Sequence, residues 1–246
     1  MAGPFPATRR SVVLASRDPD PEVRRTAFAA LVESYWKPVY KYLRVKWQTG
    51  AEEAQDLTQS FFLAALEKGT FDRYDPARAR FRTFLRTCLD GFAVNEHRAA
   101  QRLKRGGGMA AVSISVLDFD GAEEELAHQG AIGGAGTINP EEYFHREWVR
   151  ALFARAVEEL RRRCREAGRD RRFAVFERYD LEEDSARPTY AALGKDLGIP
   201  ATQVTNELAA ARRELRAIVL DTLRELTVSD DEFRAEARDA LGIDPG

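Results

Sequence analysis

The chain has 246 residues, of which 32% are charged and 44% hydrophobic, so it is long enough for one large globular domain or two small ones. Its net charge is only −2, but a neutral total does not exclude a nucleic-acid partner, because steering depends on where charges cluster. Nothing resembles a signal peptide, and no stretch approaches the roughly 18 apolar residues that span a bilayer. We therefore expect a cytoplasmic protein with no membrane partner.

Amphipathic helical patterns dominate and strand signals are nearly absent, which predicts an all-α fold. Asp20 and Pro21 predict the start of a helix whose 3–4 apolar spacing continues to Leu43. Pro38 lies inside this pattern, so we expect a kink or a break near residues 36–37. Further helices are predicted at residues 51–68 and 81–104, with an aromatic loop between them.

The composition changes between residues 106 and 140, where glycines punctuate an acidic stretch that predicts a linker with one short ordered piece around residues 112–119. Helices follow at residues 141–165 and 171–179. The stretch GKDLGIPATQVTNELAAARREL, residues 194–215, then predicts two helices around a tight corner, the second extending to residue 226. For the tail, which has a weak amphipathic piece near residues 233–241, a simple helix extension is favoured over a regulatory element.

The corner of this stretch has the residues that a helix-turn-helix needs. Gly194 is the small residue where two backbones approach, and Gly198 tolerates positive φ in the turn. The outward face carries polar groups that can bond base edges and arginines that can bind phosphates. An ordinary helical hairpin with a polar surface remains the alternative. The candidate DNA-reading residues are Thr202, Gln203, Thr205, Asn206, Glu207, Arg212 and Arg213.

Cations and aromatics are interleaved before and along the predicted helix at residues 81–104. Together they supply what unstacked bases need, a stacking platform beside charges that track a backbone. In the alternative interpretation, Phe71 and Tyr74 cap the core and the arginines form a solvated face. The candidate residues are Phe71, Arg73, Tyr74, Arg78, Arg80, Arg82, Arg86, Asn95, Arg98 and Arg102.

The helix at residues 51–68 is acidic at its start and carries Asp56 and Gln59 one turn apart, which favours a protein-docking surface over plain capping and solvation. No His, Ser or Lys lies at a spacing that would make a catalytic set. The histidines and the two cysteines, His97, His128, His145, Cys88 and Cys164, fit no metal-ligand spacing. We therefore expect no enzymatic activity, no cofactor and no metal, and two buried or half-buried thiols in a reducing compartment.

The chain carries the motif D-L-T-Q-S-F at residues 56–61 and the motif F-R-T-F-L at residues 81–85, followed by a linker and a helix-turn-helix. In this order and spacing, these elements resemble bacterial sigma-70 family RNA polymerase sigma factors of the extracytoplasmic-function (ECF) type. The resemblance implies two helical domains joined by a flexible linker. Residues 22–105 would form the region-2 bundle and residues 141–226 the region-4 helix-turn-helix, with a linker at 106–140. Residues 1–21 would be an N-terminal extension and residues 227–246 a C-terminal tail.

The resemblance also implies partners and roles. Asp56 and Gln59 match positions that contact the β′ clamp helices of core RNA polymerase, and the linker matches a segment that threads toward the RNA exit path. The loop at residues 71–80 matches the one that captures a flipped base of the −10 element of promoter DNA. The basic helix, through Arg82, Arg86, Asn95, Arg98 and Arg102, matches the surface that meets the −10 duplex and the non-template strand. The helix from residue 201 to about residue 213 would read the −35 element, and its domain would touch the β flap.

Several positions depart from the family pattern. Many relatives have Asn in place of Gly91, which puts the usual −10 base preference in question, and many have basic residues in place of Thr205 and Glu207. Thr58 and Ser60 stand where relatives often have an aliphatic residue and an acid. Since a phosphate adds about −1.5 to −2 charge, activation by a Ser/Thr kinase is one hypothesis, and a plain helix with the Thr58 hydroxyl bonded to a backbone carbonyl is the other.

An anti-sigma factor is a further candidate partner. Two rival functions also remain open at this point. One is a helix-turn-helix transcription regulator that binds duplex DNA without polymerase. The other is a sigma-like adaptor that acts without binding the polymerase core.

Overall fold

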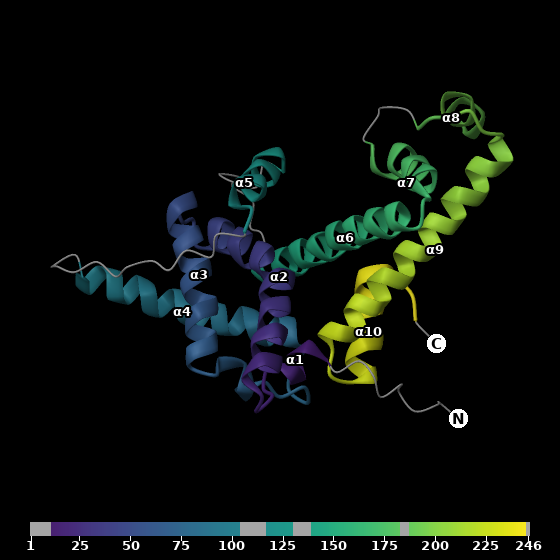
Figure 1. Cartoon of the computed structure of the whole chain (residues 1–246). Coiled ribbons are helices and arrows are strands. Elements are labelled where there is room, and N and C mark those ends of the chain that lie inside the picture. The colour runs from purple at the N-terminus through teal and green to yellow at the C-terminus, as the bar shows by residue number, and fades with distance from the viewer. Residues whose placement is uncertain (1–10, 104–116, 130–138, 183–186, 245–246) are drawn as a thin grey trace. The chain divides into compact units, whose positions relative to one another are not determined.

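The computed structural model describes residues 11–103, 117–129, 139–182 and 187–244. Within these ranges the regular structure is helical and contains no strand, so the predicted all-α fold is confirmed (Figure 1). The short 3-10 helix η1 and the π-helical turn η2 interrupt the α-helices. The elements are α1 (Val12–Ala15), α2 (Pro21–Lys46), α3 (Ala51–Glu67), η1 (Thr70–Arg73), α4 (Phe81–Leu103), α5 (Phe119–His128), α6 (Pro140–Glu166), α7 (Asp170–Phe176), η2 (Glu177–Leu181), α8 (Tyr190–Leu197), α9 (Ala201–Leu226) and α10 (Asp230–Leu241).

The chain forms two compact units. Unit 1 comprises residues 1–151 together with residues 223–246, and unit 2 comprises residues 152–222. Unit 1 therefore takes in the first turns of α6 and the helix α10, both of which lie outside the predicted region-2 range of residues 22–105. The helices that begin at Ala51, Phe81 and Pro140 start within a residue or two of their predicted positions.

The sequence predicts a kink or a break near residues 36–37; the helix α2 is continuous through Pro38, so the break is wrong. Proline lacks an N–H and removes one hydrogen bond to the carbonyl of Ser34, four residues earlier. The surrounding packing holds the helix in spite of this loss, because Pro38 and its neighbours Trp36 and Val39 are all buried. The Asp20 side chain accepts a hydrogen bond from the backbone N–H of Glu22 and caps the start of the helix, as the sequence indicates.

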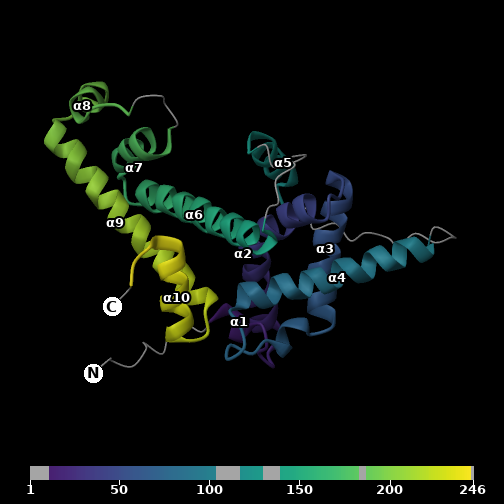
Figure 2. The same ribbon diagram turned by 180° about the vertical axis from the view of Figure 1, so that it is seen from behind.

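Aromatic side chains from distant parts of the chain make the core of unit 1. The rings of Phe28 and Phe71 stack with centroids 5.5 Å apart. Tyr35 packs edge-on against Phe81 and stacks on Trp148 from the start of α6. The helix α2 contacts α1, α3 and α5, and α3 contacts α4, which Figure 2 shows from behind. This packing fixes the loop between α3 and α4 against the core.

Two elements of unit 1 differ from the sequence-based expectations. Within the predicted linker, residues 119–128 form the helix α5, which packs the Phe119 ring against Trp36 and Tyr40 of α2. Most of the ordered piece expected around residues 112–119 lies outside the described residues. The tail is not an extension of α9. That helix ends at Leu226, and α10 begins separately after Ser229, whose side chain accepts a hydrogen bond from the backbone N–H of Glu232.

Unit 2 contains the helix pair at the predicted corner. A Cβ atom added to Gly194 would lie 2.6 Å from the backbone oxygen of Ile199, so only glycine allows this close approach. Gly198 has φ +66°, the left-handed conformation that the turn requires. Leu193, Ile199 and Val204 are buried around the turn, as their spacing predicts. Both glycines therefore have the roles assigned to them from the sequence.

No helix in the described part of the chain is both long and apolar enough to cross a bilayer.

Candidate nucleic-acid and polymerase-binding surfaces

The aromatic residues of the loop before α4 belong to the core of unit 1. Phe71 is 3% exposed and Tyr74 is 4% exposed. The Tyr74 ring packs edge-on against Phe81, and its backbone carbonyl accepts a hydrogen bond from Nη2 of Arg17 at 2.8 Å. Neither ring is open to a stacking base in this conformation, which is the arrangement expected when the two aromatics cap the core.

The predicted −10 cations divide into exposed and paired groups. Arg73, Arg78 and Arg98 are exposed, as is Asn95, and Arg78 Nε also lies 3.4 Å from a carboxylate oxygen of Asp75. Arg86 is half-buried and lies 3.4 Å from a carboxylate oxygen of Asp90 one turn along α4. Arg102 lies in the last turn of α4, and its side chain is outside the described part of the structure.

Arg80 and Arg82 are engaged by the carboxylates of α10. Arg82 Nε lies 3.0 Å from Oε1 of Glu236, and its Nη2 donates to Oδ2 of Asp239 at 2.9 Å. Arg80 pairs with the same Asp239 carboxylate. The Arg82 guanidinium also stacks over the Trp148 ring at 5.2 Å from its centroid.

Glu232 of α10 lies at the N-terminus of α4. One of its carboxylate oxygens, Oε1, accepts from the Tyr74 hydroxyl at 2.8 Å and from the backbone N–H of Phe81 at 2.9 Å. The other oxygen accepts from the backbone N–H of Val228 at 2.9 Å. The carboxylate thus occupies the positive end of a helix, where orphan N–H groups favour an anion.

Two acids of α10, Glu236 and Asp239, have perturbed pKa values. Burial raises the pKa of Glu236 to about 7, against the opposing influence of Arg82 and Arg80. Burial would also raise the pKa of Asp239, but the hydrogen bond and charge of Arg80, with the charge of Arg82, lower it below its ordinary value. Burial, together with the nearby Glu232 carboxylate, raises the pKa of the Tyr74 hydroxyl.

Sequence reasoning missed the carboxylates of α10 as partners of the candidate −10 surface. A signal was present, because residues 232, 236 and 239 repeat at the helical spacing of four and three that aligns side chains on one face. The same face carries Phe233 and Ala237, both fully or almost fully buried. An acidic stripe next to buried apolar residues indicates a face that packs against a basic surface.

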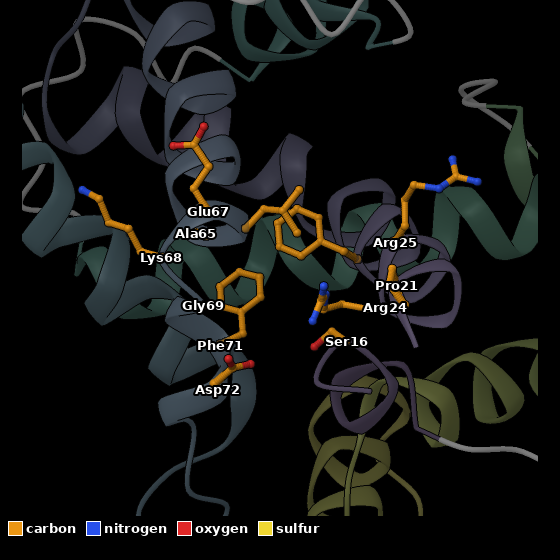
Figure 3. Close-up of a pocket in the computed structure, with 12 residues that line it drawn as sticks. Ser16, Pro21, Arg24, Arg25, Ala65, Glu67, Lys68, Gly69, Phe71 and Asp72 are labelled. Atoms are coloured by element: carbon orange, nitrogen blue, oxygen red, sulfur yellow. The ribbon is translucent and has the colours of Figure 1, made fainter. Parts of the chain in front are cut away.

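A pocket of about 610 Å³ opens beside the start of the same loop (Figure 3). Phe28 and Phe71 supply aromatic walls, and the cations Arg24, Arg25 and Lys68 lie among its lining residues. Figure 3 shows the Arg24 side chain turned toward Phe71, whereas Lys68 and Arg25 point away. The acids Glu67 and Asp72 also line the pocket, which therefore combines aromatic rings with charges of both signs.

The helix α3 does not present all its predicted polar residues to solvent. Asp56 is exposed, but Gln59 is only 5% exposed. Thr58 is fully buried, and its hydroxyl donates to the carbonyl of Ala54 at 2.7 Å. Ser60 is half-buried. Of the two predicted docking residues only Asp56 is exposed, and Ser60 is the more accessible of the two candidate hydroxyls.

In unit 2 the outward face of α9 combines open and paired side chains. Thr202, Thr205, Asn206 and Arg213 are exposed, and Gln203 is half-buried. This open part of the face carries hydroxyl, amide and guanidinium groups.

Two of the three charged residues of the α9 face, Glu207 and Arg212, have partners in unit 2. Glu207 accepts a hydrogen bond from Nε of Arg172 at 2.8 Å. Arg212 forms two hydrogen bonds with the Asp180 carboxylate, at 2.8 and 2.7 Å, and stacks on the Tyr179 ring. Glu207 and Arg212 thus connect α9 to the segment that contains α7 and η2.

The described residues contain no group of three or more His, Cys, Asp or Glu side chains arranged to hold a metal ion. Both cysteines are free; Cys88 is half-buried and Cys164 is buried.

The described part of the chain is all-helical. Its long helix α4 carries a cationic surface that begins at a loop backed by aromatic side chains.

Residues 31–103 match the family model of sigma-70 region 2. This range covers most of α2 and all of α3, η1 and α4. No curated protein and no solved structure gave a match. Residues 31–103 therefore form a sigma-70 region-2 segment, and such a segment implies a role in transcription initiation with core RNA polymerase and promoter DNA as partners.

Proposed function

We propose that this protein is a sigma factor of the ECF type, which binds core RNA polymerase, recognises −10 and −35 promoter elements and promotes promoter melting. The region-2 match over residues 31–103 carries the proposal. We assign region 2 to residues 22–105, the linker to residues 106–140 and region 4 to residues 141–226. The protein would act by binding alone, because melting requires stacking and charge and no covalent step.

The proposed −10 surface consists of the loop at residues 71–80 and the exposed side of α4. Arg73, Arg78 and Arg98 are exposed, so they can bind phosphates of the non-template strand without a rearrangement. Flipping a base out of the duplex costs a few kcal/mol of unstacking energy, which a pocket must return. The pocket beside Phe71, with Arg24, Arg25 and Lys68 in its lining, is our candidate to receive the base, and stacking there requires the Phe71 ring to turn out of the core.

The proposed −35 reader is the first half of α9. The helix pair that ends at Leu197 and begins again at Ala201, with glycine at the close approach, supports a helix-turn-helix. Thr202, Gln203, Thr205 and Asn206 would contact base edges, and Arg213 would hold a phosphate. Because Arg172 and Asp180 neutralise Glu207 and Arg212, these two residues would read DNA only after changing partners.

Binding to core RNA polymerase tests the proposal through the exposed Asp56. We expect the purified chain to bind core, and we expect Asp56→Ala to weaken binding by about tenfold through loss of a charged interface contact, on the order of 1.4 kcal/mol. The control is Asp120→Ala, which removes an exposed acid from α5. A protein that binds duplex promoter DNA but not core would instead be a helix-turn-helix regulator.

Promoter DNA binding distinguishes a sigma-like adaptor from an ECF sigma factor. An adaptor predicts that replacing the exposed Arg98 has no effect on promoter DNA binding by the polymerase complex. The ECF proposal predicts weaker binding and a smaller salt dependence, since each lost phosphate contact reduces the slope of log K against log salt by roughly one. We keep an anti-sigma factor and a Ser/Thr kinase as candidate regulators, with Ser60 as the accessible hydroxyl.

A further inference from the structure

The helix α10 covers part of the proposed −10 surface. Its carboxylates engage four donor groups at the start of α4: the Tyr74 hydroxyl, the Phe81 backbone N–H and the guanidinium groups of Arg80 and Arg82. Three of these residues, Tyr74, Arg80 and Arg82, are among those that the sigma-70 resemblance assigns to −10 DNA. The fourth group is the N-terminus of the basic helix itself.

The chemistry of this contact is the chemistry of a phosphate contact. Guanidinium groups and helix N-terminal N–H groups bind carboxylates and phosphates through the same charge-assisted hydrogen bonds. The helix α10 is also acidic, with five carboxylates (Asp230, Asp231, Glu232, Glu236 and Asp239) against the two arginines Arg234 and Arg238. A nucleic-acid strand and α10 would therefore compete for one set of donors.

The contact is one that a competitor can displace. The apolar part of the α10 face is small, with Phe233 and Ala237 as its buried members. The pairing is incomplete, because Nη1 of Arg82 and Oε2 of Glu236 are buried without a hydrogen-bond partner among the described residues. A 12-residue helix is only marginally stable in isolation, so release would convert α10 to a largely unfolded tail.

We propose that α10 is an autoinhibitory helix, whose carboxylates occupy the loop and the N-terminus of α4 in place of the −10 strand and must leave before that strand binds. This inference rests on the proposed sigma-factor function. It assigns a regulatory role to residues 227–246, where the sequence favours a plain helix extension. Its consequence is that the chain with α10 docked binds single strands more weakly than the chain with α10 released.

The test uses the full-length chain and a fluorescent pool of short DNA single strands of randomised sequence. The releasing variant combines Glu232→Ala with Asp239→Asn, which removes one contact at the α4 N-terminus and one at the arginine pair. The matched control combines Asp230→Asn with Asp231→Asn, which removes the same charge from exposed positions of the same helix. Hydrogen exchange of α10 reports whether it is docked.

We expect the releasing variant to expose α10 to exchange and to bind the pool about tenfold more tightly or better, because apparent affinity scales with the competent fraction. The control should behave like the wild type. In the wild type, adding the pool should itself increase exchange in α10. Two results would overturn the inference: α10 stays protected in the releasing variant, or it is released while the affinity matches that of the control.

Binding of each preparation to core RNA polymerase is measured in parallel. Absence of core binding in every variant would defeat the sigma-factor proposal. Core binding by every variant, with equal single-strand affinity, would defeat the autoinhibitory role alone.

Discussion

Two glycines inside helices provide a matched pair of substitutions with opposite expected effects. Gly91 lies on the exposed side of α4, and a Cβ atom added there meets nothing within 4 Å. Gly194 lies in α8, and an added Cβ would lie 2.6 Å from the backbone oxygen of Ile199 and 3.4 Å from the backbone nitrogen of Ala201. The same Gly→Ala change therefore tests the turn between α8 and α9 against an open helix position.

The magnitudes follow from these contacts. Alanine gains about 1 kcal/mol over glycine in a helix interior, so Gly91→Ala should stabilise unit 1 by about that amount. At Gly194 the same gain is opposed by overpacking, which costs about 1–3 kcal/mol. Because the clashing atoms are backbone, no side chain can rotate away, and α8 must shift from the start of α9. The difference between these two terms destabilises unit 2 by up to about 2 kcal/mol in Gly194→Ala, and the backbone clash favours the upper end of that range.

The two units can be observed separately. All three tryptophans, Trp36, Trp47 and Trp148, lie within residues 1–151, so tryptophan fluorescence during urea unfolding reports on unit 1. Hydrogen exchange of peptides from α8 and α9 reports on unit 2. Gly91→Ala should raise the urea midpoint of the fluorescence transition. Gly194→Ala should accelerate exchange in unit 2 and leave that midpoint unchanged, whereas slower exchange would refute the close approach of the two helices.

Three further predictions concern charged and hydroxyl groups. Glu207→Gln should destabilise unit 2 by about 1 kcal/mol, because it weakens the half-buried pair with Arg172; unchanged exchange of α7 would contradict this. Burial raises the pKa of Glu236 from its ordinary 4.5 to about 7. The free energy that this group contributes to α10 docking is therefore fully present below pH 4.5 and is lost as the pH rises to about 7. The loss is about 3 kcal/mol. Release of α10, measured by exchange corrected for intrinsic rates, should therefore increase with pH, and Glu236→Gln should flatten that dependence. The charged groups around it are Arg80, Arg82, Glu232 and Asp239. A Ser/Thr kinase acting on the folded protein should phosphorylate Ser60 and not the buried Thr58. Phosphate found on Thr58 by mass spectrometry would contradict the prediction that Ser60 is the more accessible hydroxyl.

Local chemistry made several features predictable from the sequence. Examples are the helix start at Asp20, the positive φ of Gly198 and the close approach at Gly194, each of which depends on one or two residues and their neighbours. The family assignment likewise depends on short motifs within residues 31–103. Such features need no knowledge of which distant segments meet.

Features that depend on distant contacts were not predictable. The packing around Pro38 outweighs its local tendency to break a helix. Composition alone indicates that the residues of α5 belong to a linker, but the ring of Phe119 anchors this helix on α2. The contact of α10 with Tyr74 joins residues 158 positions apart. For the same reason the outward polar pattern of α9 did not show that Glu207 has a partner in α7.

The most direct test of the central claim is transcription by core RNA polymerase on a promoter library with the purified full-length chain. The account predicts that the chain binds core and selects a subset of promoters that share −10 and −35 elements. It also predicts that Asp56→Ala reduces this transcription, while Asp120→Ala does not. A chain that fails to bind core, or that leaves core without promoter selectivity, would contradict the account.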